Sequence, residues 1–265
     1  MMANLSARCY AGDRDLDAIA HLINTCEEVD RLDQGTSISE LQQEFNAPSL
    51  DVARDIRLWE DAEGNLIGFA QLSVSEPGEV IDGWLWFRVH PDARGGDVEA
   101  AAIAWGEVRM REVSAMRGGR VKLRTYARAE DCDRISVLAS CGFKVDRYFC
   151  RMARSLSEPI PEPHFPEGFA LRQFPGEQDA AAWVEMFNQS FIDHWNHHDL
   201  TVDKFKHELA KPDYRNDLDL IAVADDGTFA IGAKTKVEWD QRRLQVMQQC
   251  NQTKNLILSK TLNIC

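Results

Sequence analysis

The stretch Val89–Trp105, VHPDARGGDVEAAAIAW, is the most informative part of this sequence. It follows an apolar run, Trp84–Val89, that predicts a strand. An Arg-Gly-Gly turn at residues 94–96 then leads into an alanine-rich segment, which predicts a helix from Val98 to about Met116. The N-terminus of a helix presents unpaired backbone N–H groups and the positive end of the helix dipole at one point. A strand, a glycine turn and a helix start in this order therefore predict an anion-binding loop.

Length and composition limit the possible classes of protein. The 265 residues suffice for one large domain or two of ordinary size, and 44% of them are hydrophobic, as in globular proteins. We expect no membrane interaction, because no apolar run approaches the roughly 18 residues of a membrane span and the N-terminus lacks a signal-peptide pattern. Seven irregularly spaced cysteines without a CxxC pair argue against disulfides and zinc and favour a cytoplasmic protein. A formal net charge of −13 disfavours nucleic-acid binding.

Residues 1–156 predict one complete α/β unit in the order β-α-α-β-β-β-α-β-α-β, beginning near residue 5. Besides the strand and helix around the glycine turn, the pattern predicts helices at 16–29, 37–45 and 131–140 and strands at 55–59, 66–74, 121–126 and 144–152. The segment Ser157–Pro166 holds four of the nine prolines and reads as an interdomain linker.

The sequence also repeats itself. A shift of 164 positions places Gly12, Asp15, Ala18, Asn24, Glu44, Pro48 and Asp55 on Gly176, Asp179, Ala182, Asn188, Glu208, Pro212 and Asp219 without a gap. Apolar positions agree as well, so we interpret residues 167–233 as a partial second copy of the first unit.

The second copy is not followed by a glycine-rich loop. Residues 234–265 are instead rich in Gln and Asn and carry six Lys and Arg against Glu238 and Asp240. We expect this atypical tail to be foreign to the fold, through truncation, a frameshift or misprediction of the reading frame. The alternative is a genuine helix around Trp239–Gln252.

The glycine turn resembles the acetyl-CoA loop of the GCN5-related N-acetyltransferase superfamily, whose members read V-x-P-x-x-R-G-x-G-x-G/A after their fourth strand. Val89, Pro91, Arg94 and Gly95 match. The resemblance covers the whole first unit and implies an α/β fold with a mixed central sheet flanked by helices. It also implies that the loop amides hold the cofactor pyrophosphate and that a splayed strand holds the pantetheine arm. The cofactor-binding residues that it implies are Phe87, Val89, Arg94, Gly95, Gly96, Val98 and Ala100.

At two positions of this loop where the family has glycine, this chain has Asp97 and Glu99. A carboxylate about 5 Å from a pyrophosphate charge would repel it by about 3 kcal/mol at an effective dielectric constant near 20. Asp97 stands where a helix N-cap is expected, and Glu99 lies in the favourable first turn. The two side chains could therefore fill the anion site themselves, whereas Arg94 could still reach a phosphate or could be a solvated loop residue.

The acid and base of acetyl transfer are not apparent. The family often has a glutamate at the position of Gly83; the adjacent Asp82 is a weak candidate, because strand side chains alternate and only a bulge would re-aim it. The family's acid is the tyrosine of N-x-x-A-x-x-x-Y-x-x-x-G-F, which matches Asp131–Phe143 with Leu138 in the tyrosine position. Tyr126 or Cys132 could substitute.

The stretch Asp193–Asp199, DHWNHHD, has the spacing of zinc ligands at His194 and His198. Asn196 and the N-cap Thr201 indicate a loop between two helices, so we predict no metal site. In the family this loop borders the acceptor pocket, which makes His194 and Trp195 candidate substrate contacts; a solvated loop is the alternative.

The sequence therefore predicts an N-acetyltransferase of tandem type that uses acetyl-CoA as co-substrate and acetylates an amine of a small molecule or peptide. The alternative is a catalytically silent module of the same fold that binds a ligand or acts as a scaffold.

Overall fold

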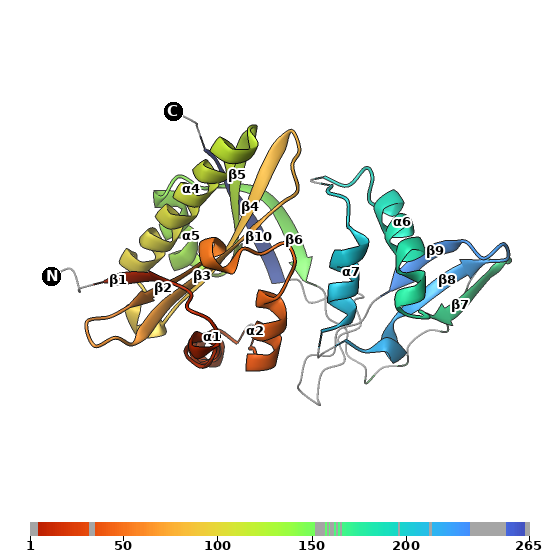
Figure 1. The fold of residues 1–265 in the computed structure, drawn as a ribbon, viewed down its shortest axis with the longest axis horizontal. Helices are drawn as coiled ribbons and strands as arrows, with labels where there is room; N and C mark the ends of the chain where they lie inside the picture. Colours follow the sequence, from red (N-terminus) through yellow and green to blue (C-terminus); the bar gives the residue numbers. More distant parts are fainter. Residues whose placement is uncertain are drawn as a thin grey trace. The chain divides into compact units, whose positions relative to one another are not determined.

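The computed structural model describes residues 5–31, 35–151, 157, 159, 162, 164, 166–195, 197–211, 214–233 and 253–262. The chain divides into two compact units (Figure 1). The first contains the described residues up to Arg151, apart from 46–48, together with the C-terminal strand, and the second contains the described residues from 157 to 233. Of the predicted linker, residues 157–166, positions 158, 160, 161, 163 and 165 lie outside the described residues.

The first unit is built on a seven-stranded mixed sheet in the order β1-β2-β3-β4-β5-β10-β6. Strands β4 and β5 run parallel, and the other described neighbours pair antiparallel. The strands are β1 (Ser6–Cys9), β2 (Ile56–Glu60), β3 (Leu66–Val74), β4 (Val80–Val89), β5 (Arg120–Arg128), β6 (Lys144–Arg151) and β10 (Thr253–Leu262). The helices of this unit are α1 (Leu16–Asp30), α2 (Ile38–Phe45), α3 (Val52–Asp55), α4 (Asp97–Arg117) and α5 (Cys132–Ser140). The predicted fold class is confirmed.

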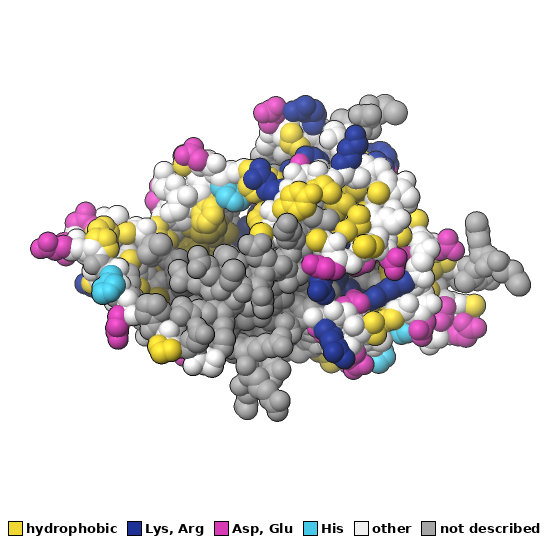
Figure 2. All heavy atoms as spheres, turned by 180° about the vertical axis from the view of Figure 1, so that it is seen from behind, with side chains coloured by type: hydrophobic (Ala, Val, Ile, Leu, Met, Phe, Trp, Pro, Cys, Tyr) yellow, Lys and Arg dark blue, Asp and Glu magenta, His cyan; other side chains and the backbone are white. Residues whose placement is uncertain are grey.

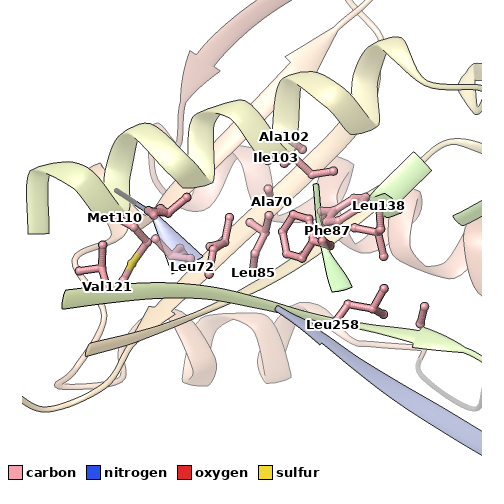
Figure 3. Close-up of a cluster of buried hydrophobic side chains, with 14 of the residues drawn as sticks. Ala70, Leu72, Leu85, Phe87, Ala102, Ile103, Met110, Val121, Leu138 and Leu258 are labelled. Carbon is pink, nitrogen blue, oxygen red and sulfur yellow. The ribbon is translucent and has the colours of Figure 1, made fainter. Parts of the chain in front are cut away.

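Two hydrophobic cores lie on opposite faces of this sheet, because side chains of a strand alternate between its faces. Beneath α4, Leu85 and Phe87 of β4 pack with Ile103 and Met110 of the helix (Figure 3). The other core joins α1 and α2 to the opposite face and consists of Leu16, Ile19, Ala20, Leu22, Ile23, Cys26, Leu41, Phe45, Ile56, Leu58 and Phe69. Strand β4 thus lies between two helical layers, and its C-terminal end is held from both sides.

Strand β10, from the C-terminal end of the sequence, lies between β5 and β6. It pairs with β5 from Asn255↔Arg128 to Leu262↔Val121 and with β6 on its other edge. Ile257 and Leu258 are each 1% exposed. The expectation that residues 234–265 are foreign to the fold is therefore wrong for 253–262. Residues 234–252, including the alternative helix at 239–252, lie outside the described residues.

The second unit has a three-stranded antiparallel sheet in the order β7-β8-β9. Its strands are β7 (Phe169–Gln173), β8 (Leu220–Ala224) and β9 (Phe229–Ala233), and its helices are α6 (Ala180–Ser190) and α7 (Val202–Leu209). The core between them consists of Phe174, Ala180, Trp183, Val184, Phe205, Ile221 and Val223. Apart from the four-residue helix α3, which precedes β2 in the first unit, the order β-α-α-β-β is that of β1, α1, α2, β2 and β3.

One asparagine in each unit makes the same local contact. In the first unit, the Asn24 side chain donates to Thr36 O at 2.9 Å and accepts from Thr36 N at 2.9 Å. In the second unit, Asn188 donates to Leu200 O at 3.0 Å and accepts from Leu200 N at 2.8 Å. Both asparagines and both partners are 164 positions apart, which is the shift of the sequence repeat. The same side chain therefore ties the first helix to the start of the second in each copy.

None of the described helices combines the length and the apolar character that crossing a membrane requires. On the face shown in Figure 2, most visible Lys and Arg side chains gather on the right-hand half, whereas Asp and Glu side chains are visible on both halves.

Candidate functional site

Strands β4 and β5 stop pairing halfway along their length. Their parallel register runs from Val80↔Arg120 to Trp84↔Arg124, whereas β4 continues to Val89 and β5 to Arg128. The last residues of the two strands therefore diverge. The glycine turn and the start of α4 follow directly after the divergent end of β4, as the sequence predicts.

The amides of the glycine turn are already occupied. Gly95 and Gly96 have φ angles of 130° and 129°, a region that favours glycine, and no atom of the other described residues outside the turn lies within 4 Å of the position of a Cβ at either. Their N–H groups donate to the two carboxylate oxygens of Glu99, at 3.3 Å and 3.0 Å. Glu99 is 8% exposed. A carboxylate of the chain itself thus takes the place where the resemblance puts a phosphate.

Asp97 does not share this role. The N-cap of α4 is Gly96, and Asp97 is the first helical residue, with an exposed side chain. The expectation that Asp97 caps the helix is therefore wrong, because the turn ends one residue earlier. Of the two carboxylates, Glu99 is the one that accepts from the loop amides, as the hypothesis expects.

Arg94 ties the loop to the end of α1. Its guanidinium binds both carboxylate oxygens of Asp30, at 2.7 Å and 2.8 Å, and its Nε donates to Val89 O at 3.2 Å. The Asp30 carboxylate raises the pKa of Arg94. Cys26 also donates to Val89 O, at 3.2 Å, and burial raises the pKa of its thiol. Arg94 is thus an organised part of the loop and not a freely solvated residue.

The other predicted cofactor residues differ in exposure. Phe87, Val89 and Val98 are 1%, 5% and 4% exposed. Val98 packs so closely on Gly68 of β3 that a Cβ there would lie 2.6 Å from its Cγ1. These three residues can offer a ligand mainly their backbone. Ala100 is exposed on the first turns of α4.

Arg134 lies where β4 and β5 diverge, and the sequence analysis did not identify it. Its Cζ lies 3.9 Å from the centroid of the Phe87 ring on β4, and its Nε donates to Tyr126 O on β5 at 2.9 Å. Burial lowers the pKa of Arg134 to about 10. The signal was present in the sequence, because Arg134 occupies the alanine position of the motif that matches Asp131–Phe143.

Asp82 is bound in a buried ion pair. It is 1% exposed, and its carboxylate accepts from Arg124 Nε at 2.6 Å. Arg124 also binds Asp146, which carries a pKa below its usual range. The register between β4 and β5 is unbroken from Val80↔Arg120 through Asp82↔Lys122 to Trp84↔Arg124, so no bulge re-aims the Asp82 side chain. This geometry favours a role in holding the sheet together over a role as base.

The remaining acid and base candidates are no better placed. A Cβ at Gly83 would lie 2.3 Å from Met110 Sδ, so this packing leaves no space for a glutamate there. Leu138 is fully buried in the core beneath α4. Tyr126 is half exposed and stacks on Trp84 with ring centroids 5.0 Å apart, and burial raises its pKa. Cys132 is exposed at the start of α5.

His194 and Trp195 lie between α6 and α7, in the predicted loop of the second unit. The exposed His194 ring contacts the rings of Phe191 and Trp195, with centroids 5.5 Å and 6.0 Å apart. Within the described part of the chain, no three His, Cys, Asp or Glu side chains are grouped so that they could hold a metal ion.

Comparison with known proteins adds relatives and structural neighbours. No family model matches the chain. It is 28% identical over 200 residues to a mycothiol acetyltransferase of Thermobispora bispora, a match that covers 75% of this chain and 61% of that protein. It is 29% identical over 194 residues to a mycothiol acetyltransferase of Streptomyces bingchenggensis, covering 71% and 59%. The chain thus matches about three fifths of the length of these relatives.

Two solved structures share its fold. A GCN5-related N-acetyltransferase from Sphaerobacter thermophilus superposes with a TM-score of 0.70 and 18% identity, over 97% of this chain and 95% of that one. A tandem GNAT protein from the clavulanic acid biosynthesis pathway gives a TM-score of 0.60 and 15% identity, over 86% and 72%.

Proposed function

We propose that the chain is a tandem-type protein of the GCN5-related N-acetyltransferase (GNAT) superfamily and that it transfers the acetyl group of acetyl-CoA to an amine of a small molecule or peptide, as its similarity to the proteins named above supports. The observation that carries this proposal is the divergence of β4 and β5 beyond Trp84↔Arg124, directly before a glycine turn and a helix start. Beyond Trp84, no strand among the described residues pairs with the edge of β4 that faces β5, which suits an extended ligand, and amides lie at the end of this edge.

In this proposal the backbone of Phe87 and Val89 lies along the pantetheine arm, and the amides of Gly95 and Gly96 receive the pyrophosphate. Arg94 supplies positive charge beside them, while Val98 and Ala100 form the start of the helix. Glu99 has to release the two amides before a phosphate can accept from them, which requires its carboxylate to turn away from the loop.

For the acceptor, we propose only that it carries an amine. The relatives named above are mycothiol acetyltransferases, and an acceptor that carries an amine is consistent with them. We propose that His194 and Trp195 of the second copy contact this acceptor. A cytoplasmic location accords with seven cysteines that lack the spacing of disulfide or zinc frameworks.

A second function is favoured by two observations in the same unit. Glu99 fills the loop amides, and Leu138 replaces the tyrosine that acts as acid in the family. Both would suit a catalytically silent module that binds a ligand or acts as a scaffold.

Isothermal titration with acetyl-CoA, followed by an assay of thiol release with a panel of amines, tests the proposal. We expect binding by the full chain and release of CoA with at least one amine. Arg94→Gln should weaken binding, because it removes a positive charge beside the loop. Arg120→Gln, which removes the same charge from an exposed position, should leave binding unchanged. Binding without turnover of any amine would favour the silent module, and no binding at all would refute an acetyl-CoA site in this chain.

A further inference from the structure

Arg134 bridges the two strands that hold the proposed cofactor site. Helix α5 begins at the N-cap Asp131, whose carboxylate accepts from Arg134 N at 3.0 Å, so Arg134 belongs to the first turn. From there its side chain reaches the ring of Phe87 on β4 and the carbonyl of Tyr126 on β5. Both contacts lie beyond Trp84↔Arg124, where the strands no longer pair. The guanidinium therefore contacts both strands where they diverge, next to the Phe87–Val89 segment along which the proposed function lays the pantetheine arm.

This placement is unfavourable for an arginine. Burial lowers the pKa of Arg134 to about 10; the nearby charges of Arg88 and Arg94 act in the same direction, and those of Asp131 and Glu99 act against it. A cation in the first turn of a helix also opposes the helix dipole. The alanine of the family motif would avoid all three effects and is the best helix former. A residue that conflicts with its local surroundings in this way is expected at functional sites.

The guanidinium retains donors for a ligand. Nε is used by Tyr126 O, whereas Nη1 and Nη2 have no hydrogen-bond partner among the residues that the structure describes. Leu138, at the position of the family's tyrosine, follows Arg134 by four residues and so lies on the same side of α5. Leu138 cannot donate a proton, whereas Arg134 carries donors on the same side of the helix.

We propose, on the basis of the proposed function, that Arg134 is a catalytic residue that stabilises the departing thiolate of CoA in place of the missing tyrosine. The amine nitrogen attacks the thioester carbonyl carbon, so that an N–C bond forms and the C–S bond breaks. The bonding electron pair goes to sulfur, and the guanidinium donates hydrogen bonds to this thiolate while keeping its own proton. The proton of the attacking amine leaves to solvent. Hydrogen bonds from a charged donor to a developing anion are among the stronger ones available to a protein.

The acidity of the CoA thiol on the protein measures this interaction without turnover. The ultraviolet absorbance of the thiolate is followed against pH for CoA bound to wild type, Arg134→Gln, Arg134→Lys and the control Arg120→Gln. An opposite charge next to an ionising group shifts its dissociation constant by about tenfold or more. Wild type, R134K and R120Q should therefore bind a thiol at least about tenfold more acidic than the thiol bound by R134Q.

Other charged groups near Arg134 stay unchanged in all four proteins. They are Arg88 on β4, Arg94 in the turn, Glu99 on α4 and Asp131 on α5. A difference between R134Q and the other three proteins is then due to residue 134. Melting temperatures close to that of the wild type show that the variants are folded, which is expected for a partly exposed side chain.

Kinetics provide a second readout. R134Q should lower kcat for acetyl transfer at least tenfold with little change in KM, and R134K should recover much of this loss. An unchanged thiol acidity in R134Q would overturn the proposal. So would an R134Q variant that binds acetyl-CoA more tightly with undiminished kcat, because Arg134 would then only obstruct the site. Wild-type protein that binds neither CoA nor acetyl-CoA would overturn the proposed function as well, which distinguishes the two failures.

Discussion

Replacement of Leu258 by alanine tests whether the C-terminal strand is part of the first unit. Leu258 is 1% exposed and belongs to the same buried cluster as Leu85 and Phe87 (Figure 3). Removing a buried leucine side chain from a packed core costs about 2–5 kcal/mol of unfolding free energy. Thr261 of the same strand is exposed, so Thr261→Ala should change stability by no more than about 0.5 kcal/mol.

A measurement specific to the first unit is needed, because two units can unfold separately. Cys26 is 1% exposed in the core beneath α1, and residues 166–233 contain no cysteine. Alkylation of Cys26, quantified by mass spectrometry of its peptide under native conditions, therefore reports opening of the first unit. Since 1.4 kcal/mol is a factor of ten, Leu258→Ala should accelerate labelling roughly 30-fold to several thousandfold.

Two outcomes of the labelling experiment would refute this reasoning. If Cys26 in Leu258→Ala is labelled at the wild-type rate, β10 does not stabilise the sheet of the first unit. If Thr261→Ala accelerates labelling as much as Leu258→Ala does, burial of the Leu258 side chain is not the cause.

Two further predictions concern the loop and the repeat. Glu99→Gln should lower the unfolding free energy by about 1 kcal/mol, because the interaction with the loop amides weakens. The same variant should bind acetyl-CoA about tenfold more tightly for each 1.4 kcal/mol of repulsion that is removed. High salt should diminish that gain in affinity, because it screens the charges. The exposed Asp97→Asn is its control and should do less; micromolar binding by wild type with no gain in Glu99→Gln would show that Glu99 does not compete with the cofactor. Asn24→Ala should speed alkylation of Cys26, because it leaves the backbone N–H and C=O of Thr36 without this partner (about 1–3 kcal/mol), whereas Asn188→Ala should not; equal effects would contradict independent roles of the two asparagines.

Much of the fold follows from local sequence. The helix predicted from Val98 to about Met116 is α4 (Asp97–Arg117), and the strands predicted at 55–59 and 66–74 are β2 and β3. Hydrophobic periodicity and glycine positions determine such elements, and both are visible within a short window. The C-terminal strand was missed because its composition suggested a foreign tail, whereas its position depends on β5 and β6, more than a hundred residues earlier.

Some residues of the candidate site can likewise be predicted from local sequence, and others cannot. Glu99 follows the turn by three residues, so its contact with the loop amides could be anticipated from helix-capping geometry. Arg134 lies 38 positions after Gly96 in the sequence, and only the fold brings it to the end of β4. Strand alternation predicts only which face of the sheet the Asp82 side chain lies on. Its partner Arg124 cannot be inferred from the sequence, because the parallel register of β4 and β5 is a long-range property.

The position of β10 also affects how the protein can be made. A ribosome completes β5 and β6 about a hundred residues before it reaches Thr253, which takes about 5–20 s at ordinary elongation rates. During that interval the facing edges of β5 and β6 both lack their partner and are open to wrong pairing. Slow stretches of messenger RNA between these segments would lengthen the exposure, and chaperones that cover strand edges would shorten it. The yield of folded protein should therefore respond to translation speed after residue 151 more than before it.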